Sequence, residues 1–453
     1  MKRGDFLKTS AAAVAAAIMP ETAVCAEERA LALSAQNRSA PLEIGSPDFE
    51  LSLDFRALEK AKAQITFHNG YAVLIDNDLD SPCWWRKTGS LRGVRNIVKN
   101  FAKDGEWSGI KIRVHGAQIC VWVGGVKVVE YIEPKNPYRT NGNSLLSPRA
   151  TRAEICLISE SGVLEYKNVK ISPLARRFDL ENQRAMAIDE ASDSAIRLHQ
   201  ADFPVLDFHV HLKGGMTIDW ALARSRKLGI NYAIAPNCGR DFELNTAQKA
   251  QSFLDEAKNF PALICMQGEG REWHKLFPAE IREQFDFVFT DAMTFDDPRG
   301  SRTHIWRDSE VKIPKGGEME YFEHMKKVVC QVIAEPADIY ANPLWLPRAL
   351  APDFGKYWTR QNKQIVVDAL LQHQKPMEIN TTLKNIPDME LIEMAHAQGV
   401  KFSFGTNNIN PEFSPFGDPE IKSHYGKFDK VLKIVETLGL APSDIYKPRM
   451  RRA

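Results

Sequence analysis

Cysteine is scarce in this chain of 453 residues, and no two of its seven cysteines form a CxxC pair. Most of them sit in apolar runs such as AQICVWV and AEICLIS, where cysteine behaves as a small hydrophobic residue. This spacing argues against a zinc–thiolate site and against a disulfide scaffold, although one or two disulfides remain compatible with an oxidising compartment. The sequence also lacks a serine or cysteine motif that would mark a catalytic nucleophile.

An excess of charge of one sign is missing as well. Lysine and arginine number 59 against 58 acidic residues, and the basic residues do not gather in one block. Such a balance excludes a nucleic-acid-binding surface as the main function. The chain is 44% hydrophobic and 26% charged, as in a soluble globular protein, and its length exceeds one ordinary core. We therefore expect two domains.

No apolar run near the N-terminus is long enough to anchor the chain in a membrane. The segment MKRGDFLKTSAAAVAAAIMP has a basic start and then a short alanine-rich run, and Ala26 offers a small residue for cleavage. Residues 1–26 are thus predicted to be an export signal peptide. KRGDFLK resembles the twin-arginine signal, with Lys2 in place of the first arginine. We expect a periplasmic or extracellular protein with no stable membrane insertion after cleavage.

Residues 46–174 have the pattern of short strands joined by turns. Segments such as FELSLDFR, GYAVLIDN and GIKIRVHGAQICVWVGGVKVVEY alternate apolar and polar residues, and no helical period interrupts them. Regularly spaced short strands of this kind predict a β-sandwich. Trp107, Trp122 and Tyr131 serve either in its core or in stacking against sugar rings.

This half resembles the 3-keto-disaccharide hydrolase domain, which implies a concanavalin-like jelly roll. The resemblance rests on GYAVLIDN, TGSLRGVRN, GEWSGIKIRVHGAQICVWVGGVKVVEY and YKNVKISPL. The chain departs from the family at VGG, where an asparagine usually precedes the glycine, and at AEICLISESG. These departures favour an accessory or glycan-binding domain rather than a catalytic one.

After a charged, helix-like segment at 175–203, interpreted as a linker, the period of the sequence changes. Strand patterns alternate with helical patterns such as TIDWALARSRKLG and RQNKQIVVDALLQHQ, as in a parallel sheet or barrel. Seven strands are predicted, within residues 204–212, 231–237, 262–270, 285–293, 338–346, 375–380 and 401–408.

Polar residues stand at the carboxyl end of every predicted strand, where barrels carry their chemistry. In DFHVH, Asp207, His209 and His211 point to one face of the strand because side chains alternate. Two histidines and two carboxylates suit Zn²⁺, Mn²⁺ or Fe²⁺, so we predict one or at most two divalent ions. The predicted metal ligands are His209, His211, Glu269 and Asp291. The predicted substrate-binding residues are Asn237, Asn342, Glu378 and Asn407.

Residues 204–440 resemble the PHP (polymerase and histidinol phosphatase) family, which implies a distorted seven-stranded βα barrel with metals at the strand ends. DFHVH matches the family's opening motif, which assigns a metal role to His209 and His211. GEG implies the same role for Glu269, and FTDA for Asp291. The family's further histidines are absent, because those places contain PNCG, ANP and GTNNIN. The usual trinuclear centre is therefore not expected.

The loops after the third and fourth strands supply candidates for proton transfer and anion binding. Arg271, His274 and His304 are the predicted catalytic residues, and Arg299 and Arg302 would suit a phosphate or carboxylate. The sequence thus predicts an exported metal-dependent hydrolase or lyase for a carbohydrate-derived substrate. The alternative is a non-catalytic carbohydrate-binding protein whose barrel has lost its metals. Oligomeric state is not predicted.

Overall fold

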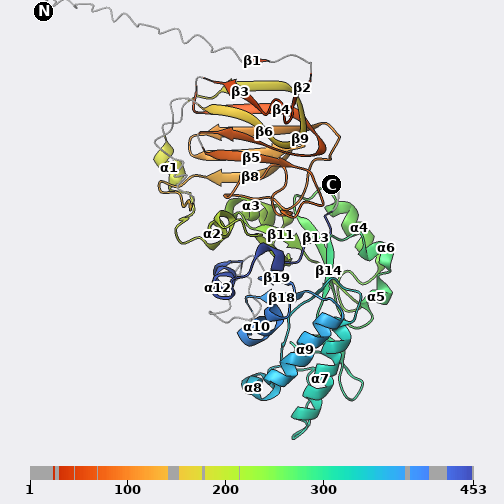
Figure 1. The fold of residues 1–453 in the computed structure, drawn as a ribbon. Helices are drawn as coiled ribbons and strands as arrows, with labels where there is room; N and C mark the ends of the chain where they lie inside the picture. Colours follow the sequence, from red (N-terminus) through yellow and green to blue (C-terminus); the bar gives the residue numbers. More distant parts are fainter. Residues whose placement is uncertain are drawn as a thin grey trace, which may run out of the picture.

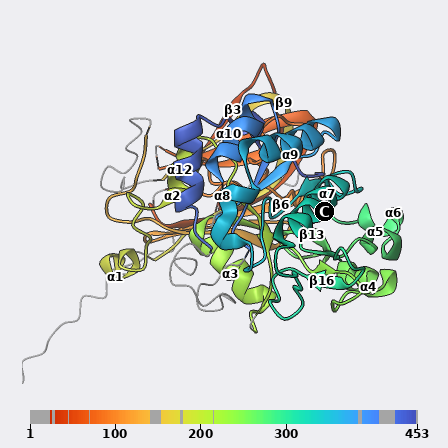
Figure 2. The same ribbon diagram turned by 90° about the horizontal axis from the view of Figure 1, so that it is seen from below.

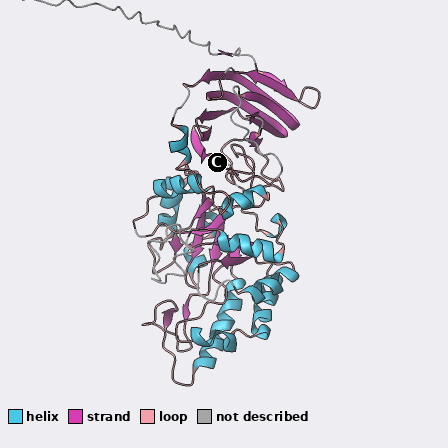
Figure 3. Cartoon of the chain, turned by 90° about the vertical axis from the view of Figure 1, so that its left-hand side faces the viewer, coloured by secondary structure: helices cyan, strands magenta, loops and turns pink. Residues whose placement is uncertain are grey.

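The computed structural model describes residues 24–25, 30–44, 46–68, 70–140, 153–175, 179–213, 215–382, 388–407 and 426–450. An antiparallel sandwich forms one end of the molecule and a parallel-strand barrel the other (Figure 1). Helices gather on the barrel half (Figure 3). The predicted fold class is confirmed. Most of the predicted signal peptide, and the cleavage position Ala26, lie outside the described residues.

The sandwich is built from antiparallel strands that pair in the order β1-β9-β4-β6-β7-β8, with β2 and β3 also on β9 and β5 on β4. Its strands are β1 (Val24–Cys25), β2 (Leu31–Leu33), β3 (Ser39–Glu43), β4 (Phe49–Phe67), β5 (Tyr71–Asp76), β6 (Ser108–His115), β7 (Gln118–Val123), β8 (Val126–Ile132) and β9 (Glu154–Pro173).

Two long strands, β4 and β9, each belong to both layers of the sandwich. The first half of β4 pairs with β6 and its second half pairs with β5. Strand β9 pairs with both halves of β4. The bend in β4 falls at Glu59 and Lys60, which have positive φ angles and interrupt the alternation of buried residues. The sequence predicted separate strands here. The backbone instead bends without ending the strand, because register shifts absorb the extra residues.

The barrel contains seven parallel strand positions in the order in which they occur along the chain, with β12 as a short extension after β11. Its strands are β10 (Leu206–Val210), β11 (Asn231–Ile234), β12 (Asn237–Cys238), β13 (Leu263–Gly268), β14 (Phe287–Thr290), β17 (Ile339–Tyr340), β18 (Met377–Asn380) and β19 (Phe402–Gly405). All seven predicted strands are present.

The two edge strands of the barrel are joined by side-chain bonds rather than by a ladder. Asp207 on β10 accepts the Thr406 backbone N–H at 3.1 Å and also binds the Thr406 hydroxyl. The barrel is thus nearly closed, and its first and last strands hold their carboxyl ends together.

Helices surround the barrel strands (Figure 2). They are α3 (Ile218–Leu228), α4 (Ala247–Ala257), α5 (Trp273–Leu276), α6 (Ala279–Arg282), α7 (Glu318–Ile333), η1 (Ala351–Asp353), α8 (Phe354–Tyr357), α9 (Arg360–Gln372), α10 (Met389–Ala397), α12 (Asp429–Leu438) and η3 (Pro442–Asp444). Thr217 caps the start of α3, and Gly229 ends it in the left-handed conformation. In the described part of the chain no helix is long and apolar enough to cross a membrane.

The junction between the halves is packed rather than loose. The segment interpreted as a linker forms α1 (Leu180–Arg184) and α2 (Ser194–Gln200). Trp84, Trp85 and Val98 of the N-terminal half belong to the apolar core of the barrel, and Ile196 of α2 belongs to that of the sandwich. Apolar side chains are therefore buried on both sides of the junction between the sandwich and the barrel.

Cys83, Cys120, Cys156, Cys238, Cys265 and Cys330 are free thiols. Cys120, Cys238 and Cys265 are buried, as expected for cysteines in apolar runs, whereas Cys156 in AEICLIS is only partly buried.

Candidate active site at the strand ends of the barrel

His209 and His211 lie at the carboxyl end of β10 and are both buried. Their Nε2 atoms face each other at 2.9 Å. Alternation along the strand places both rings on the face that also carries Asp207, as the sequence predicted. The Asp207 carboxylate accepts the His209 backbone N–H at 3.1 Å, so it fixes the strand below the rings. Burial raises the pKa of Asp207 to about 7.

The other nitrogen of each ring faces a group that only accepts hydrogen bonds. Nδ1 of His209 lies 2.6 Å from Oε1 of Glu378, and Nδ1 of His211 lies 2.6 Å from the Ala235 carbonyl oxygen. Each Nδ1 must therefore carry the ring proton. If both rings are neutral, two Nε2 lone pairs point at each other. A cation between the rings, or an extra proton on one of them, removes this repulsion.

Burial favours the neutral form of His211. Desolvation holds its pKa well below the ordinary value, and the charges of Lys213 and His209 lower it further. His211 thus presents a lone pair toward His209 at neutral pH. Metal-bound histidines in proteins typically show this arrangement, in which Nδ1 donates to a carbonyl or carboxylate and Nε2 is free to bind.

Asp291 and Glu269, the predicted carboxylate ligands, lie in the same buried region but are held by amide groups. Oδ2 of Asp291 accepts from Nδ2 of Asn342 at 2.7 Å and from Nε2 of Gln267 at 3.1 Å. Oε1 of Glu269 accepts from Nδ2 of Asn237 at 2.8 Å. Desolvation raises the pKa of both carboxyl groups, and the charge of Asp291 raises that of Glu269 further.

Asn342 connects the carboxylates to the histidines. Its backbone N–H donates to Oε2 of Glu378 at 2.9 Å, and its Oδ1 accepts from Asn380 at 2.9 Å. A continuous network therefore runs from the His pair through Glu378 and Asn342 to Asp291. Three predicted substrate-binding residues, Asn237, Asn342 and Glu378, belong to this network and position its charged members.

Asn407, the fourth predicted substrate-binding residue, follows β19 with a positive φ angle of 57°. Its Oδ1 is buried and accepts no hydrogen bond within the described residues. Residues 408–410, the rest of the GTNNIN segment in which the family resemblance implied a further ligand, lie outside the described residues.

The three predicted catalytic residues lie around the network and are engaged by other groups. Arg271 donates to the Asp291 carbonyl oxygen at 2.7 Å and pairs with Glu335 at 2.9 Å. His304 Nδ1 lies 2.6 Å from Oε2 of Glu310. The ring of His274 on α5 lies edge-on against Trp273, and desolvation and nearby cations lower its pKa.

The two further arginines predicted to bind an anion also have partners. Arg302 pairs with Asp241 at 2.5 Å and with Glu272 at 2.9 Å, and Arg299 pairs with Asp297 at 3.1 Å. The loop that carries them contains a hairpin of β15 (Thr294–Asp296) and β16 (Arg302–His304). Its positive charge is largely balanced by local carboxylates.

Gln267 was not predicted from the sequence, although it is central to the site. It accepts from Asn237 at 3.0 Å and donates to Asp291, and it also lies beside His211. Gln267 could have been recognised in the segment MQGEG, because residues two apart on a strand share a face. Gln267 and Glu269 therefore point the same way, and a polar residue at the first position indicates that the polar face extends deeper.

The His pair fits one divalent ion better than the full predicted ligand set does. Nε2 of His209 and Nε2 of His211 lie 2.9 Å apart, so both nitrogens could bind the same ion. Across the described residues, however, no three His, Cys, Asp or Glu side chains converge as a metal site. His209 and His211 can hold an ion, whereas Glu269 and Asp291 are bound to amides.

In the sandwich, the three aromatic residues singled out by sequence fall into two groups. Tyr131 is buried, and its hydroxyl binds Glu190 at 2.5 Å. The Trp107 ring has the charged groups of Arg56 and Lys167 over it at 4.9 and 4.5 Å. The Trp122 ring has Lys111 and Lys127 over it at 4.3 and 5.6 Å. Core packing is the role of Tyr131, and cations stack on both tryptophans.

Three solved structures are each similar to a part of this chain. A proposed glycosyl hydrolase from Parabacteroides distasonis is 20% identical over 33% of this chain and 90% of its own, with a TM-score of 0.27. A carbohydrate binding module from Bacillus subtilis is 12% identical over 30% and 76%, with a TM-score of 0.20. A proposed histidinol phosphatase from Listeria monocytogenes is 13% identical over 47% and 98%, with a TM-score of 0.35. A comparison with curated proteins gave no match.

The sandwich also matches a family model. Residues 42–172 match the domain described as 3-keto-alpha-glucoside-1,2-lyase-like. This range runs from β3 to the end of β9, which confirms the resemblance predicted for the N-terminal half. The match ends before the first strand of the barrel, so the sandwich, rather than the whole chain, is what resembles that domain.

Proposed function

We propose that the barrel carries a hydrolase or lyase centre for a carbohydrate-derived substrate and that the sandwich is its accessory or glycan-binding domain. The observation that carries this proposal is the His209–His211 pair, whose Nε2 atoms lie 2.9 Å apart while both Nδ1 atoms face acceptors. The carbohydrate class rests on the match of residues 42–172 to the 3-keto-alpha-glucoside-1,2-lyase-like domain.

His209 and His211 would hold one divalent ion, Zn²⁺, Mn²⁺ or Fe²⁺. Such an ion, when bound, activates water and polarises a substrate oxygen. Glu378 and the Ala235 carbonyl keep the two rings oriented by accepting their Nδ1 protons. Glu378 and the Ala235 carbonyl would thereby direct both Nε2 atoms to the same point.

Glu269 is the proposed proton carrier of the centre. Burial and the neighbouring Asp291 charge raise its pKa, so its carboxyl can hold a proton near neutral pH and transfer it. Asn237 binds Oε1 of Glu269 and orients that carboxyl. Glu269 would protonate a leaving oxygen in hydrolysis, or remove and return a proton beside a carbonyl in a lyase reaction.

We also propose that the protein is exported, on the strength of residues 1–26. The second candidate function remains a carbohydrate-binding protein without a metal. One observation favours it: Asn342, Gln267 and Asn237 donate to Asp291 and Glu269, which satisfies these carboxylates without an ion.

The deciding experiment combines elemental analysis with thermal unfolding of native protein and His211→Ala, each in chelator and in added Zn²⁺ or Mn²⁺. Binding to the native state alone stabilises it, so we expect about one ion per chain and a gap between the two proteins that widens with metal. His373→Ala, an exposed histidine, is the matched control. Metal-free protein, with the same gap in chelator and in metal, would reject the catalytic proposal and favour the binding protein.

A further inference from the structure

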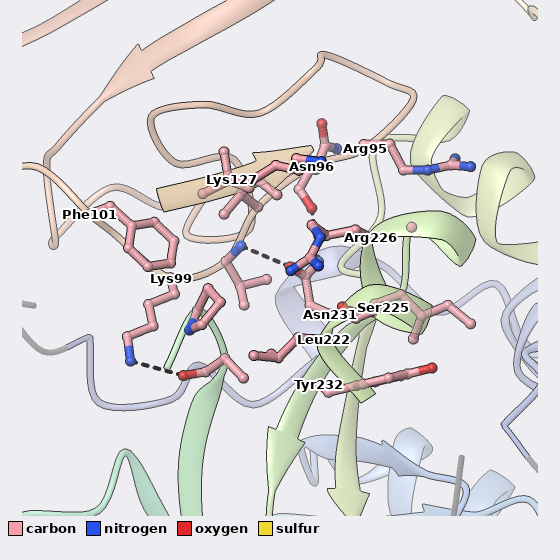
Figure 4. Close-up of a pocket in the computed structure, with 17 residues that line it drawn as sticks. Arg95, Asn96, Lys99, Phe101, Lys127, Leu222, Ser225, Arg226, Asn231 and Tyr232 are labelled. Atoms are coloured by element: carbon pink, nitrogen blue, oxygen red, sulfur yellow. Dashed lines mark hydrogen bonds between the residues drawn. The ribbon is translucent and has the colours of Figure 1, made fainter. Parts of the chain in front are cut away.

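A pocket at the junction of the sandwich and the barrel is lined by cationic and amide side chains (Figure 4). The N-terminal half contributes residues 95–99, Phe101, Lys127 and Val128. The barrel contributes residues from α3, from β11 and the turn before it, and from the two positions that precede β13. Among these described lining residues there is no aspartate or glutamate. The pocket therefore offers positive charge without a carboxylate of its own.

Most of the cations at this pocket are already bound by protein groups. Lys99 donates to the carbonyl oxygens of Phe260 and Ala262 at 2.8 and 2.9 Å. Lys127 pairs with Glu130 at 3.3 Å. Arg95 donates to two carbonyl oxygens, and its guanidinium points away from the pocket (Figure 4). Nε of Arg95 is a buried donor without a partner in the described part of the chain, but it belongs to a guanidinium that points away from the pocket (Figure 4).

Arg226 of α3 differs from them. Its guanidinium lies in the middle of the pocket (Figure 4), and its Nε is buried without a hydrogen-bond partner among the described residues. Nδ2 of Asn96, a residue only 2% exposed, likewise has no partner there. A buried donor without an acceptor is destabilising, so the unpaired Nε of Arg226 and Nδ2 of Asn96 beside one pocket indicate a missing acceptor.

The missing acceptor must be small. The cavity volume of the pocket is only about 30 Å³. That interior admits a few non-hydrogen atoms. The guanidinium presents paired N–H groups that match the oxygens of a phosphate or carboxylate.

We propose that this pocket binds a small oxyanion, either phosphate or the carboxylate of a sugar acid, with Arg226 as its main ligand. The bound anion would connect α3 of the barrel to the 95–99 segment of the N-terminal half. It would thereby stabilise the junction between the domains. This site is separate from the strand-end centre and does not depend on the chemistry proposed there.

The experiment measures thermal unfolding and calorimetric binding of the full chain in sodium phosphate and in sodium glucuronate. Sodium chloride at matched ionic strength is the reference. We expect a saturable rise in melting temperature with one or both anions, and phosphate against glucuronate distinguishes the two sources. Arg226→Gln should bind at least tenfold more weakly. Lys227→Gln, which removes the same charge from an exposed neighbour on the same helix, should bind as the native protein does.

Arg226→Lys serves if the glutamine variant does not fold, because it keeps the charge but loses the paired donors; it too should bind more weakly than the native protein. The proposal is overturned if neither anion gives a saturable shift beyond chloride. It is also overturned if Arg226→Gln, or the lysine variant used in its place, and Lys227→Gln lose binding equally, because the effect would then be general charge rather than a site.

Discussion

Glu378 holds His209 through a contact of 2.6 Å between Oε1 and Nδ1, although the two residues lie at opposite ends of the barrel sequence. The second oxygen of Glu378 accepts the Asn342 backbone N–H at 2.9 Å. One carboxylate therefore fixes the orientation of the ring and the position of the strand end after β17. This relationship makes Glu378 a positioning residue of the proposed centre.

Glu378→Gln should weaken the binding of Zn²⁺ or Mn²⁺ about 10–100-fold, as the loss of a histidine's supporting partner typically does. An amide cannot accept from both His209 and the Asn342 N–H, since one of its ends is a donor. Calorimetric titration of metal measures this change. Glu393→Gln, on an exposed position of α10, is the control, and equal metal affinity in both variants would show that Glu378 does not orient a ligand.

Asn342→Asp should convert the amide network into a stronger cation site. The new carboxylate would face Oδ2 of Asp291 at the position where Asn342 now donates at 2.7 Å. Two adjacent carboxylates repel unless a proton or a cation lies between them. We expect a lower melting temperature in chelator and a rise on adding Mn²⁺ at least twice that of the native protein. Asn342→Leu, which removes the amide without adding charge, should show no such rise.

Stability should fall on acidification because His199 is buried in its neutral form. Burial lowers its pKa to about 3, and its Nε2–H donates to the Gly229 carbonyl oxygen at 2.6 Å. The unfolded chain binds a proton near pH 6.5 and the folded chain only near pH 3, so stability is complete above 6.5 and is lost as pH falls below it. This residue alone contributes a slope of about 1.4 kcal/mol per pH unit.

Urea unfolding at several pH values between 7 and 4 measures that slope. His199→Gln should flatten it, whereas the exposed His373→Gln should leave it unchanged. A slope that is identical in all three proteins would mean that other groups control the acid response.

The two halves should unfold together, because the junction is part of the barrel core. Trp85 packs in that core and donates its indole N–H to Asp202 at 3.1 Å. Trp85→Ala should cost about 3–5 kcal/mol and lower the single transition of the whole chain. Trp107→Ala, at a half-exposed ring of the sandwich, should cost less. Two separate calorimetric transitions in the native protein would contradict this expectation.

The local patterns of the sequence predicted the elements well. Alternation predicted the sandwich strands, and the change of period near residue 204 predicted the barrel and all seven of its strands. His209 and His211 could be placed on one face for the same reason. These features depend on residues close together in the chain, whose side-chain directions follow from the backbone period.

Sequence alone placed polar residues at the strand ends but could not assign their partners. Asn342 binds Asp291 and Arg271 binds Glu335, and both pairings depend on which strands and helices become neighbours. Arg271 and His304 were predicted to be catalytic from their loops, yet the structure places them in ion pairs and supporting bonds. Arg271 also donates to the Asp291 carbonyl oxygen, so its partners could be assigned only once the strand ends were placed in space.

The residue pattern was sufficient to predict a strand-rich half followed by a βα barrel with a histidine pair at the end of its first strand. The three-dimensional arrangement was needed to find that Glu378 and Ala235 direct both Nε2 atoms to one point, and that residues of the N-terminal half enter the apolar core of the barrel. Periodicity depends only on neighbouring residues along the chain, and so it can be recognised without the fold. Hydrogen-bond partners and burial depend on the closure of the barrel, which brings β10 beside β19 and His209 within reach of Glu378 on β18.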